Sequence, residues 1–532
     1  MRKKKQALFI NSCIALFFIL CVILPILSML SRITPAGIHQ VISSPQFGPA
    51  VWNSVATAFT AALLSILLAL AAAWCVERTA IKGKAIYSMI FLLPMLIPSI
   101  SHALGLIALF GNNGILTNLL QGKWNIYGFG GIVAGSVMYS FPVAFLMFSN
   151  ILRCEDGLTY KAAAVLGIPP GRQFRDITLP YLKRTILSAF FAVFTMVITD
   201  YGVPLMIRGK RLTLSVMMYE KAVSMMDYGS GSVVGALLLL PAIAAFLVDM
   251  WNPEKGQAGF VSEPVEQRKR GLSIILAHLF SGLVGICVLL PILSFCIMAV
   301  ETKYPVDPTF TLYHVQRAFD RGAGEYLFNS LGYAFLAAAF GTLFAFGCAY
   351  MTAREKGSLH RGLHLISITA MAIPGIVLGL SYVIFFHRTP IYGTVAIIVL
   401  ANSVHFFASP YLMMYNTLEK VNPNLEAVGE SLGIGRLHLL KDVIFPKVQH
   451  TLCEMFSYFF VNSMMTISAV SFLVPPAPKP VALLINQFEA QLLMESAAVV
   501  SVLILFINAA LKVVLSLAEQ KEDRLREASG RN

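Results

Sequence analysis

Long apolar stretches alternate with short polar ones along nearly the whole chain. A helix of about 20 apolar residues is long enough to cross the hydrocarbon core of a bilayer. The pattern therefore predicts about twelve membrane-spanning helices and an all-α integral membrane protein. The predicted spans lie near residues 8–30, 52–74, 86–110, 132–152, 185–203, 232–250, 273–299, 328–351, 364–386, 393–415, 453–473 and 496–517.

The composition agrees with a membrane protein. Hydrophobic residues make up 57% of the chain, charged residues make up only 13%, and the mean hydropathy is +0.73. Soluble domains are considerably more polar than this. Glycine and proline also occur inside several of the predicted spans, which membrane helices tolerate better than soluble ones do.

The net charge of +13 could indicate nucleic-acid binding, but the basic residues follow a different rule. Lysine and arginine gather on alternate loops, at residues 2–5, 78–84, 161–184, 268–270, 354–361 and 436–447. Cytoplasmic loops of membrane proteins carry such an excess of positive charge. We therefore expect both termini to be cytoplasmic, and we expect no nucleic-acid partner.

Two of these basic loops contain versions of one motif. In each copy a helix with small residues reaches a glycine, and a proline follows thirteen residues after that glycine. The motif residues are Ala162, Ala163, Leu166, Gly167 and Pro180 in the first copy, and Glu430, Leu432, Gly433 and Pro446 in the second. Glycine suits the left-handed position that ends a helix. One copy alone would be read as an ordinary amphipathic loop, but the matched pair favours a docking site for a soluble partner.

The duplication extends beyond the motif. Asn53-Ser54 and Asn329-Ser330 each open a predicted span, and the offset between these two copies is close to the offset between the motif glycines. Because six spans is an even number, the two halves share one orientation. We expect a first half over residues 1–251, a cytoplasmic linker over 252–271 and a second half over 272–532, with a pathway where the halves meet.

Five residues are candidates for the gate or pathway: Asp200, Tyr201, Ser468, Pro98 and Pro374. Asp200 is an ionisable group toward the outer end of a span, where charge is costly and commonly functional. The alternative is that Asp200 caps a neighbouring helix. Ser468 lies near the equivalent place in the second half. The two prolines are expected to kink their spans, which frees backbone carbonyls that can line a cavity.

The sequence offers no sign of catalysis. A phosphate-binding loop of the form Gly-x4-Gly-Lys-Ser/Thr does not occur. The eight cysteines include no Cys-x-x-Cys pair, and His102 and His405 are single histidines in apolar spans, expected to bond to neighbouring helices. We therefore expect no catalytic, cofactor or metal site in this chain, and expect any ATP hydrolysis to come from a separate polypeptide.

The motif resembles the signature of permeases in ATP-binding-cassette importers. The shared pattern is Ala-Ala-x-x-Leu-Gly followed by Ile-x-Leu-Pro, and the resemblance is to the fused, two-in-one permeases of the ferric-iron, thiamine and phosphonate type. It covers nearly the whole chain. Lys161 and Ala427 stand where that family has a glutamate, and Glu426 lies one residue earlier in the second copy.

This resemblance implies a type I importer permease fold, in which the two motif loops are coupling helices. The implied partners are two copies of a cytoplasmic ATPase, which would bind the ATP and magnesium, and an extracytoplasmic solute-binding protein. The implied location is the plasma membrane of a prokaryote, with several spans in the bilayer. The implied cargo is a small solute, with ferric iron first and thiamine or phosphonate next.

An ion-coupled secondary transporter of the major-facilitator kind is the alternative. Such carriers also have six plus six parallel spans and cytoplasmic termini. Their characteristic cytoplasmic loop, however, lies between spans two and three of each half, where this chain has residues 77–84 without the expected Gly-x-x-x-Asp pattern. They would also be expected to show several membrane-embedded acids, whereas Asp200 is nearly alone.

Overall fold

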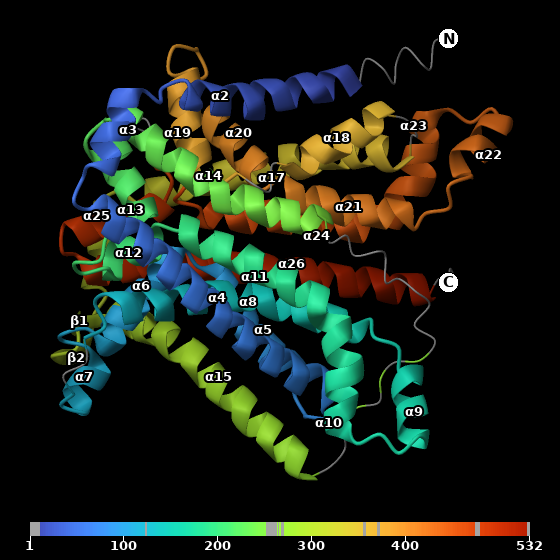
Figure 1. The fold of residues 1–532 in the computed structure, drawn as a ribbon, viewed down its shortest axis with the longest axis horizontal. Coiled ribbons are helices and arrows are strands. Elements are labelled where there is room, and N and C mark those ends of the chain that lie inside the picture. The colour runs from blue at the N-terminus through green and yellow to red at the C-terminus, as the bar shows by residue number, and fades with distance from the viewer. Residues whose placement is uncertain are drawn as a thin grey trace.

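The computed structural model describes residues 11–122, 125–251, 263, 265, 267, 271–354, 358–369, 373–473 and 479–528. These residues form an almost entirely helical molecule whose long helices run roughly along one axis, with a single two-stranded hairpin at one end (Figure 1). The predicted all-α fold is confirmed.

The first half of the described chain contains η1 (Ile19–Ile23), α2 (Leu24–Leu30), α3 (Pro35–Ile42), α4 (Phe47–Arg78), α5 (Lys84–Leu92), η2 (Leu93–Leu96), α6 (Ser99–Phe110), α7 (Ile115–Leu119), α8 (Phe129–Arg153), α9 (Leu158–Val165), α10 (Pro170–Gln173), η3 (Phe174–Thr178), α11 (Leu179–Thr199), α12 (Gly202–Ile207), α13 (Leu214–Tyr219), η4 (Glu220–Ser224) and α14 (Tyr228–Trp251).

The second half contains α15 (Gly271–Met298), β1 (Glu301–Lys303), β2 (Asp307–Phe310), α16 (Tyr313–Asp320), α17 (Ala323–Arg354), α18 (Ser358–Thr369), α19 (Gly375–Phe386), α20 (Val395–His405), α21 (Ala408–Glu419), α22 (Leu425–Ser431), α23 (Arg436–Leu439), η6 (Leu440–Ile444), α24 (Phe445–Met465), α25 (Ala482–Ala490) and α26 (Met494–Ala528).

Within the described residues, nine helices are long and apolar enough to cross a membrane, or ten if α20 and α21, which meet at 54°, count as one span. The remaining predicted spans are helical but less regular. The span predicted near 364–386 consists of the shorter helices α18 and α19, and α19 begins directly after Pro374. The span predicted near 86–110 is broken before α6, where Ile97 and Pro98 have extended backbone.

The span predicted near 453–473 is wrong in its bounds. Helix α24 begins eight residues earlier, at Phe445, with Pro446 in its first turn, and it ends at Met465. Proline in the first turn starts a helix readily because its missing N–H would have no partner there. The apolar window therefore placed this helix too late, because the first turns of α24 are polar. Ser468 consequently lies in the turn after α24 rather than inside a span.

The internal duplication is visible in matching elements. Helices α4 and α17 are both 32 residues long, α11 and α24 are both 21 residues long, and the members of each pair hold corresponding places in the two halves. The predicted match between Ser54 and Ser330 is confirmed in detail. The Ser54 hydroxyl accepts a 2.7 Å hydrogen bond from the backbone N–H of Leu214, and Ser330 accepts the same bond from Val481.

Small residues allow the helices of each half to pack closely. Helix α4 buries a row of alanines that begins at Ala58 and Ala61 and continues to Ala73, and it packs along α8 and α11. Helix α17 packs on α21 and α24 with a similar row. In a bilayer, where no hydrophobic effect holds helices together, such close contacts are a main source of association.

The first helix of each half packs on the opposite half. The Asn11–Leu30 span lies against α19, and its Phe17 and Phe18 contact Phe344 and Phe407 of the second half at ring-centroid distances of 4.2 and 5.2 Å. Helix α15 packs on α6, where the Ser294 hydroxyl donates to the backbone carbonyl of Gly105. The two halves therefore interlock.

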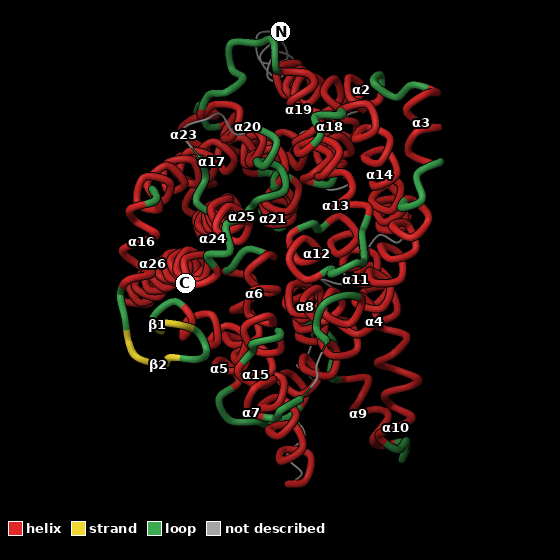
Figure 2. The backbone as a smooth tube through the Cα atoms, turned by 90° about the vertical axis from the view of Figure 1, so that its left-hand side faces the viewer, coloured by secondary structure: helices red, strands yellow, loops and turns green. Residues whose placement is uncertain are grey.

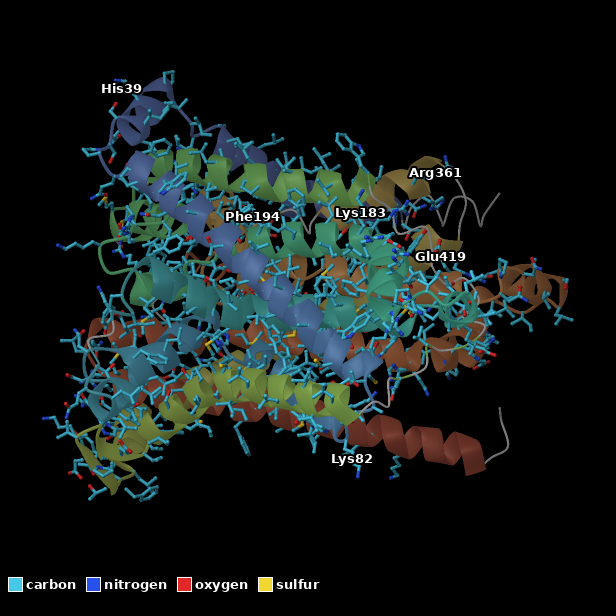
Figure 3. The ribbon with its side chains drawn as sticks, turned by 60° about the horizontal axis from the view of Figure 1, so that its bottom comes forward. His39, Lys82, Lys183, Phe194, Arg361 and Glu419 are labelled. Carbon is cyan, nitrogen blue, oxygen red and sulfur yellow. The ribbon has the colours of Figure 1, made fainter. Side chains whose placement is uncertain are left out.

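Both motif loops lie at the same end of the molecule, as halves with one orientation require. Elements α9, α10, α22 and α23 are at the right of Figure 1, while α3, α7, α12, α13, α25 and the hairpin are at the left. We call residues 158–178 and 425–444 the docking loops, and the opposite end the far end. Lys82, Lys183 and Arg361 lie toward the docking-loop end in Figure 3, whereas His39 lies at the far end.

Candidate functional site

The two docking loops have the same backbone. Gly167 and Gly433, the motif glycines, have φ angles of +69° and +72°, which confirms the predicted left-handed turn at the end of each first helix. In both loops a short helix follows (α10 or α23), then one π-helical turn (η3 or η6), and then a long span that carries Pro180 or Pro446 in its first turn. A Cβ atom added to either glycine would meet nothing within 4 Å, so only the backbone conformation demands glycine there.

The docking loops expose large apolar side chains at the end of the bundle. Leu166 and Leu432 are 76% and 69% exposed, and Val165 and Leu437 are 88% and 80% exposed. Ala162 is exposed beside them, whereas Ala163 is buried against the loop. The backbone of Glu430 lies in α22, and its side chain is outside the described part. Exposed apolar side chains that gather in this way mark a surface that interacts with a protein or a membrane.

The first docking loop is held by a buried ion pair. Arg78, the last residue of α4, contacts Glu155 just before α9, and both side chains are almost fully buried. The hydroxyl of Tyr160 in α9 donates a 2.6 Å hydrogen bond to the same carboxylate. The Arg78 guanidinium also lies 5.7 Å from the centre of the Tyr160 ring. This arrangement ties α9 to the end of α4.

The second docking loop has the equivalent ion pair with more contacts. Arg354, the last residue of α17, donates to both carboxylate oxygens of Glu426 at 2.7 and 2.5 Å. The same guanidinium donates to the backbone carbonyls of Leu418, Val421 and Asn422. Although burial alone would raise the pKa of Glu426, the hydrogen bonds and charge of Arg354 lower it below its ordinary value.

Each docking loop thus has a glutamate that pairs with an arginine, although neither glutamate stands at the position that the permease signature gives it. Glu155 precedes α9 and Glu426 lies in α22, and each bonds to the arginine that ends the second long helix of its half. Lys161 has a different contact: it pairs with Glu263, whose backbone carbonyl also accepts a 2.8 Å hydrogen bond from Gly157. An exposed pair of this kind contributes little to stability.

A cavity of about 390 Å³ lies between the two halves. From the first half it is lined by α8, α11, α14 and the segment with Met95 and Ile97 before α6, and from the second by α20, α21, α24 and the turn at residues 373–375. Its polar lining consists of Tyr139, Ser188, Thr195, Thr199, Asp200, His405, Ser409, Tyr458, Asn462 and Ser468. A cavity with convergent polar groups at the interface of two repeats is the usual form of a transporter's binding site.

The structure brings three of the predicted pathway residues to this cavity. Asp200, Ser468 and Pro374 all line it, whereas Pro98 does not, although its neighbours Met95 and Ile97 do. Asp200 also caps a helix, since its carboxylate accepts hydrogen bonds from the backbone N–H groups of Gly202 and Val203 at 3.3 and 3.0 Å. The two interpretations of Asp200 are thus compatible.

Tyr201 lies behind the cavity wall and joins the halves. Its side chain is fully buried, and its hydroxyl shares a hydrogen bond with Ser471 and donates to the backbone carbonyl of Ile467 at 3.4 Å. Next to it, a Cβ on Gly202 would lie 2.4 Å from the Ser99 hydroxyl and 3.1 Å from the Ile467 side chain. We call Tyr201, Gly202, Ile467 and Ser471 the far-end seal, because they pack tightly on that side of the cavity.

Several cavity residues were not predicted. The sequence did not single out Tyr139, Ser409, Tyr458 or Asn462. His405 was expected to be structural, but it lines the cavity. The missing signal was helix register: Tyr458, Asn462 and Met465 follow a three-to-four residue spacing on one face of α24, which becomes informative only once the bounds of α24 are known.

Comparison with known proteins agrees with this duplicated architecture. The family described as binding-protein-dependent transport system inner membrane component matches residues 65–252 and 340–524, once in each half. A ferric transport system permease protein of Actinobacillus pleuropneumoniae is 24% identical over 460 residues, covering 83% of this chain and 66% of that protein. An Fe(3+)-transport system permease protein of Haemophilus influenzae is 21% identical over 469 residues, covering 84% and 86%.

A more distant relative is similar over a shorter region. The thiamine transport system permease protein of Brucella abortus is 26% identical over 178 residues, which is 32% of this chain and 32% of that protein.

Proposed function

Because the chain belongs to the family of binding-protein-dependent transport system inner membrane components, we propose that it carries ferric iron inward through the cavity between its halves. It is a multi-pass membrane permease of an ATP-binding-cassette importer and not itself an enzyme. The family assignment favours this function over the ion-coupled carrier that the span arrangement alone left open.

The pair of docking loops is the single observation that best supports ATP hydrolysis by a separate subunit as the energy source. They repeat one backbone, expose apolar side chains at one end of the bundle, and are each tied by an arginine–glutamate pair to a long helix. We propose that one copy of a separate ATPase docks on each loop, that ATP and magnesium bind there, and that this end is cytoplasmic. Both termini would then be cytoplasmic as well.

The proposed cargo is supported by the names of the relatives and by the chemistry of the cavity. Two relatives that align with more than four fifths of this chain are named as ferric transport permeases. Phenol, hydroxyl and carboxylate oxygens line the cavity, and oxygen donors suit a hard cation. Thiamine and phosphonate remain second choices for the substrate.

Reconstitution tests this function. Proteoliposomes holding the chain and its ATPase should accumulate radioactive ferric iron when the solute-binding protein and ATP are supplied. Omission of the ATPase, the solute-binding protein or ATP should abolish uptake. Thiamine and phosphonate should not compete. Uptake driven by a proton gradient without the ATPase would contradict the proposal, and uptake of thiamine instead of iron would contradict only the substrate.

A further inference from the structure

Two turns at the far end form a matched pair that the proposed function does not yet use. Met226 and Leu492 are separated along the chain by the same offset as the two motif glycines. Both have a left-handed backbone, with φ angles of +54° and +58°. The duplication has therefore kept one backbone conformation in both halves at this end too.

These two turns resemble the helix ends that usually carry glycine. The N–H of Asp227, after Met226, donates to the carbonyl of Lys221, and the N–H of Leu493 donates to the carbonyl of Phe488, each at 2.8 Å. Such bonds close a helix over a left-handed residue, where a side chain is disfavoured. Among the described residues other than glycine, only Gln121 also has a positive φ. Strained backbone of this kind gathers at functional sites.

Each of the two strained turns exposes an apolar side chain to solvent. Met226 is 75% exposed and Leu492 is 83% exposed. Their immediate surroundings are polar rather than lipid-like: Asp227 caps α14 through the N–H of Ser230, and Gln491 accepts a hydrogen bond from Arg321. An apolar centre with a polar rim is the composition of a protein interface.

The elements that carry the first of these turns reach the far-end seal. Tyr219, at the end of α13, stacks on Tyr201 with ring centroids 4.8 Å apart and contacts Phe472 of the second half. Element η4 follows directly and leads to Met226. Figure 2 shows α12, α13 and α25 near the middle of the far end, surrounded by α3, α4, α7, α16 and the hairpin.

We propose that Met226 and Leu492 are the two contact points on which the solute-binding protein docks, one on each half, and that this contact acts on the seal at Tyr201 through Tyr219. The inference rests on the proposed function, since it names where that partner binds. A single partner that touches both points at once binds more tightly than either point alone would hold it, so the two contacts reinforce each other.

The test replaces each side chain by glycine, the residue that these turns accept most easily. Binding of the solute-binding protein that supports uptake by this chain is measured by surface plasmon resonance on the permease–ATPase complex in nanodiscs. We expect the dissociation constant to rise about threefold for Met226→Gly or Leu492→Gly, and at least tenfold for the double variant. ATPase stimulation by the binding protein should fall in parallel.

Leu119→Ala is the matched control, because Leu119 is 73% exposed at the far end but belongs to α7. It should bind within twofold of the wild type. Binding within twofold by the double glycine variant would overturn the inference alone. Failure of the wild-type complex to bind the solute-binding protein would overturn the proposed function and this inference with it.

Discussion

The two docking loops have the same backbone conformation, but different contacts hold them to the rest of the protein. In the first half, Arg78 bonds to Glu155, and its buried Nε has no partner among the described residues. In the second half, Arg354 bonds to Glu426 and to three backbone carbonyls. The duplication has preserved the ion pair, whereas the number of bonds to the neighbouring backbone has diverged. Arg354 therefore holds the neighbouring backbone as well as its glutamate, whereas Arg78 contacts its glutamate and the Tyr160 ring.

The two halves also differ at the far end, in the residues that follow their matching helices. Asp200 and Tyr201 follow α11, while Thr466 and Ile467 hold the matching places after α24. The first half supplies the polar groups, and the second supplies the backbone carbonyl of Ile467 and the Ser471 hydroxyl that receive Tyr201. The seal thus depends on both halves although only one carries the tyrosine.

The largest expected effect comes from the anchors, the ion pairs Arg78–Glu155 and Arg354–Glu426 that hold the docking loops. Arg78→Met should lower the free energy of unfolding by about 3–5 kcal/mol, because it leaves the buried carboxylate of Glu155 unpaired. Arg354→Met should lower it less, because the Glu426 side chain is 20% exposed to water. Adding Glu155→Leu to Arg78→Met should restore most of that loss. Adding Glu426→Leu to Arg354→Met should restore less, because the carbonyl of Val421 still lacks the donor that Arg354 supplies. Thermal unfolding of the four purified variants decides this, and equal rescue in both halves would refute the difference between the anchors.

The next effect concerns the left-handed turns. A β-branched residue at φ near +70° costs about 1–3 kcal/mol. Gly167→Val and Gly433→Val should therefore each reduce iron uptake several-fold, and the double variant more, while membrane levels stay constant. Gly332→Val in α17 is the control, since it lies outside both docking loops, a Cβ there meets nothing within 4 Å and its φ is not positive. Full uptake by the double variant would show that these turns do not serve docking.

A smaller effect is expected at the seal. Tyr201→Phe removes the hydroxyl that joins the halves, which is worth about 1 kcal/mol, or roughly a fivefold shift of the closed state. ATP hydrolysis without binding protein should rise accordingly. Tyr382→Phe is a matched control, because Tyr382 is equally buried and its hydroxyl bonds across the halves to the carbonyl of Cys21, yet it is not part of the far-end seal. A similar rise in both variants would show that Tyr201 has no particular role in keeping the far-end seal closed.

The smallest effect is a pH dependence in the second loop. The pKa of Glu426 is lowered in the folded protein, so its ionised form stabilises the fold above the ordinary value of 4.5. That contribution is lost as the pH falls through the lowered value. The stability difference between wild type and Glu426→Gln should therefore be constant from pH 8 to about pH 5.5. A difference that shrinks steadily over that range would mean that Arg354 does not hold the carboxylate charged.

Sequence reasoning found what repeats along the chain. The left-handed glycines, the matched serines at 54 and 330 and the shared orientation of the halves were all predictable, because each follows from residue types at fixed offsets. Only one member of each ion pair was predictable. Arg78 and Arg354 were recognisable at the ends of their spans, but Glu155 and Glu426 lie at different sequence separations from Gly167 and Gly433.

The cavity was harder to predict for a physical reason. Its lining comes from many segments of both halves that meet only through tertiary packing, and polar residues such as Tyr139 and Asn462 look unremarkable within their own helices. The bounds of α24 were predicted too late because its polar first turns lowered the local hydropathy. That shift hid which face of the helix Tyr458 and Asn462 share.

The central claim is that both loops receive the same ATPase. Photo-cross-linking from a benzoylphenylalanine placed at Leu166 or at Leu432 tests it directly, because both side chains are exposed on their docking loops. The account predicts that each position cross-links to the same ATP-binding polypeptide, and that a permease carrying both probes captures two copies. Cross-linking from only one position, or from neither, in membranes where the complex hydrolyses ATP would contradict the account.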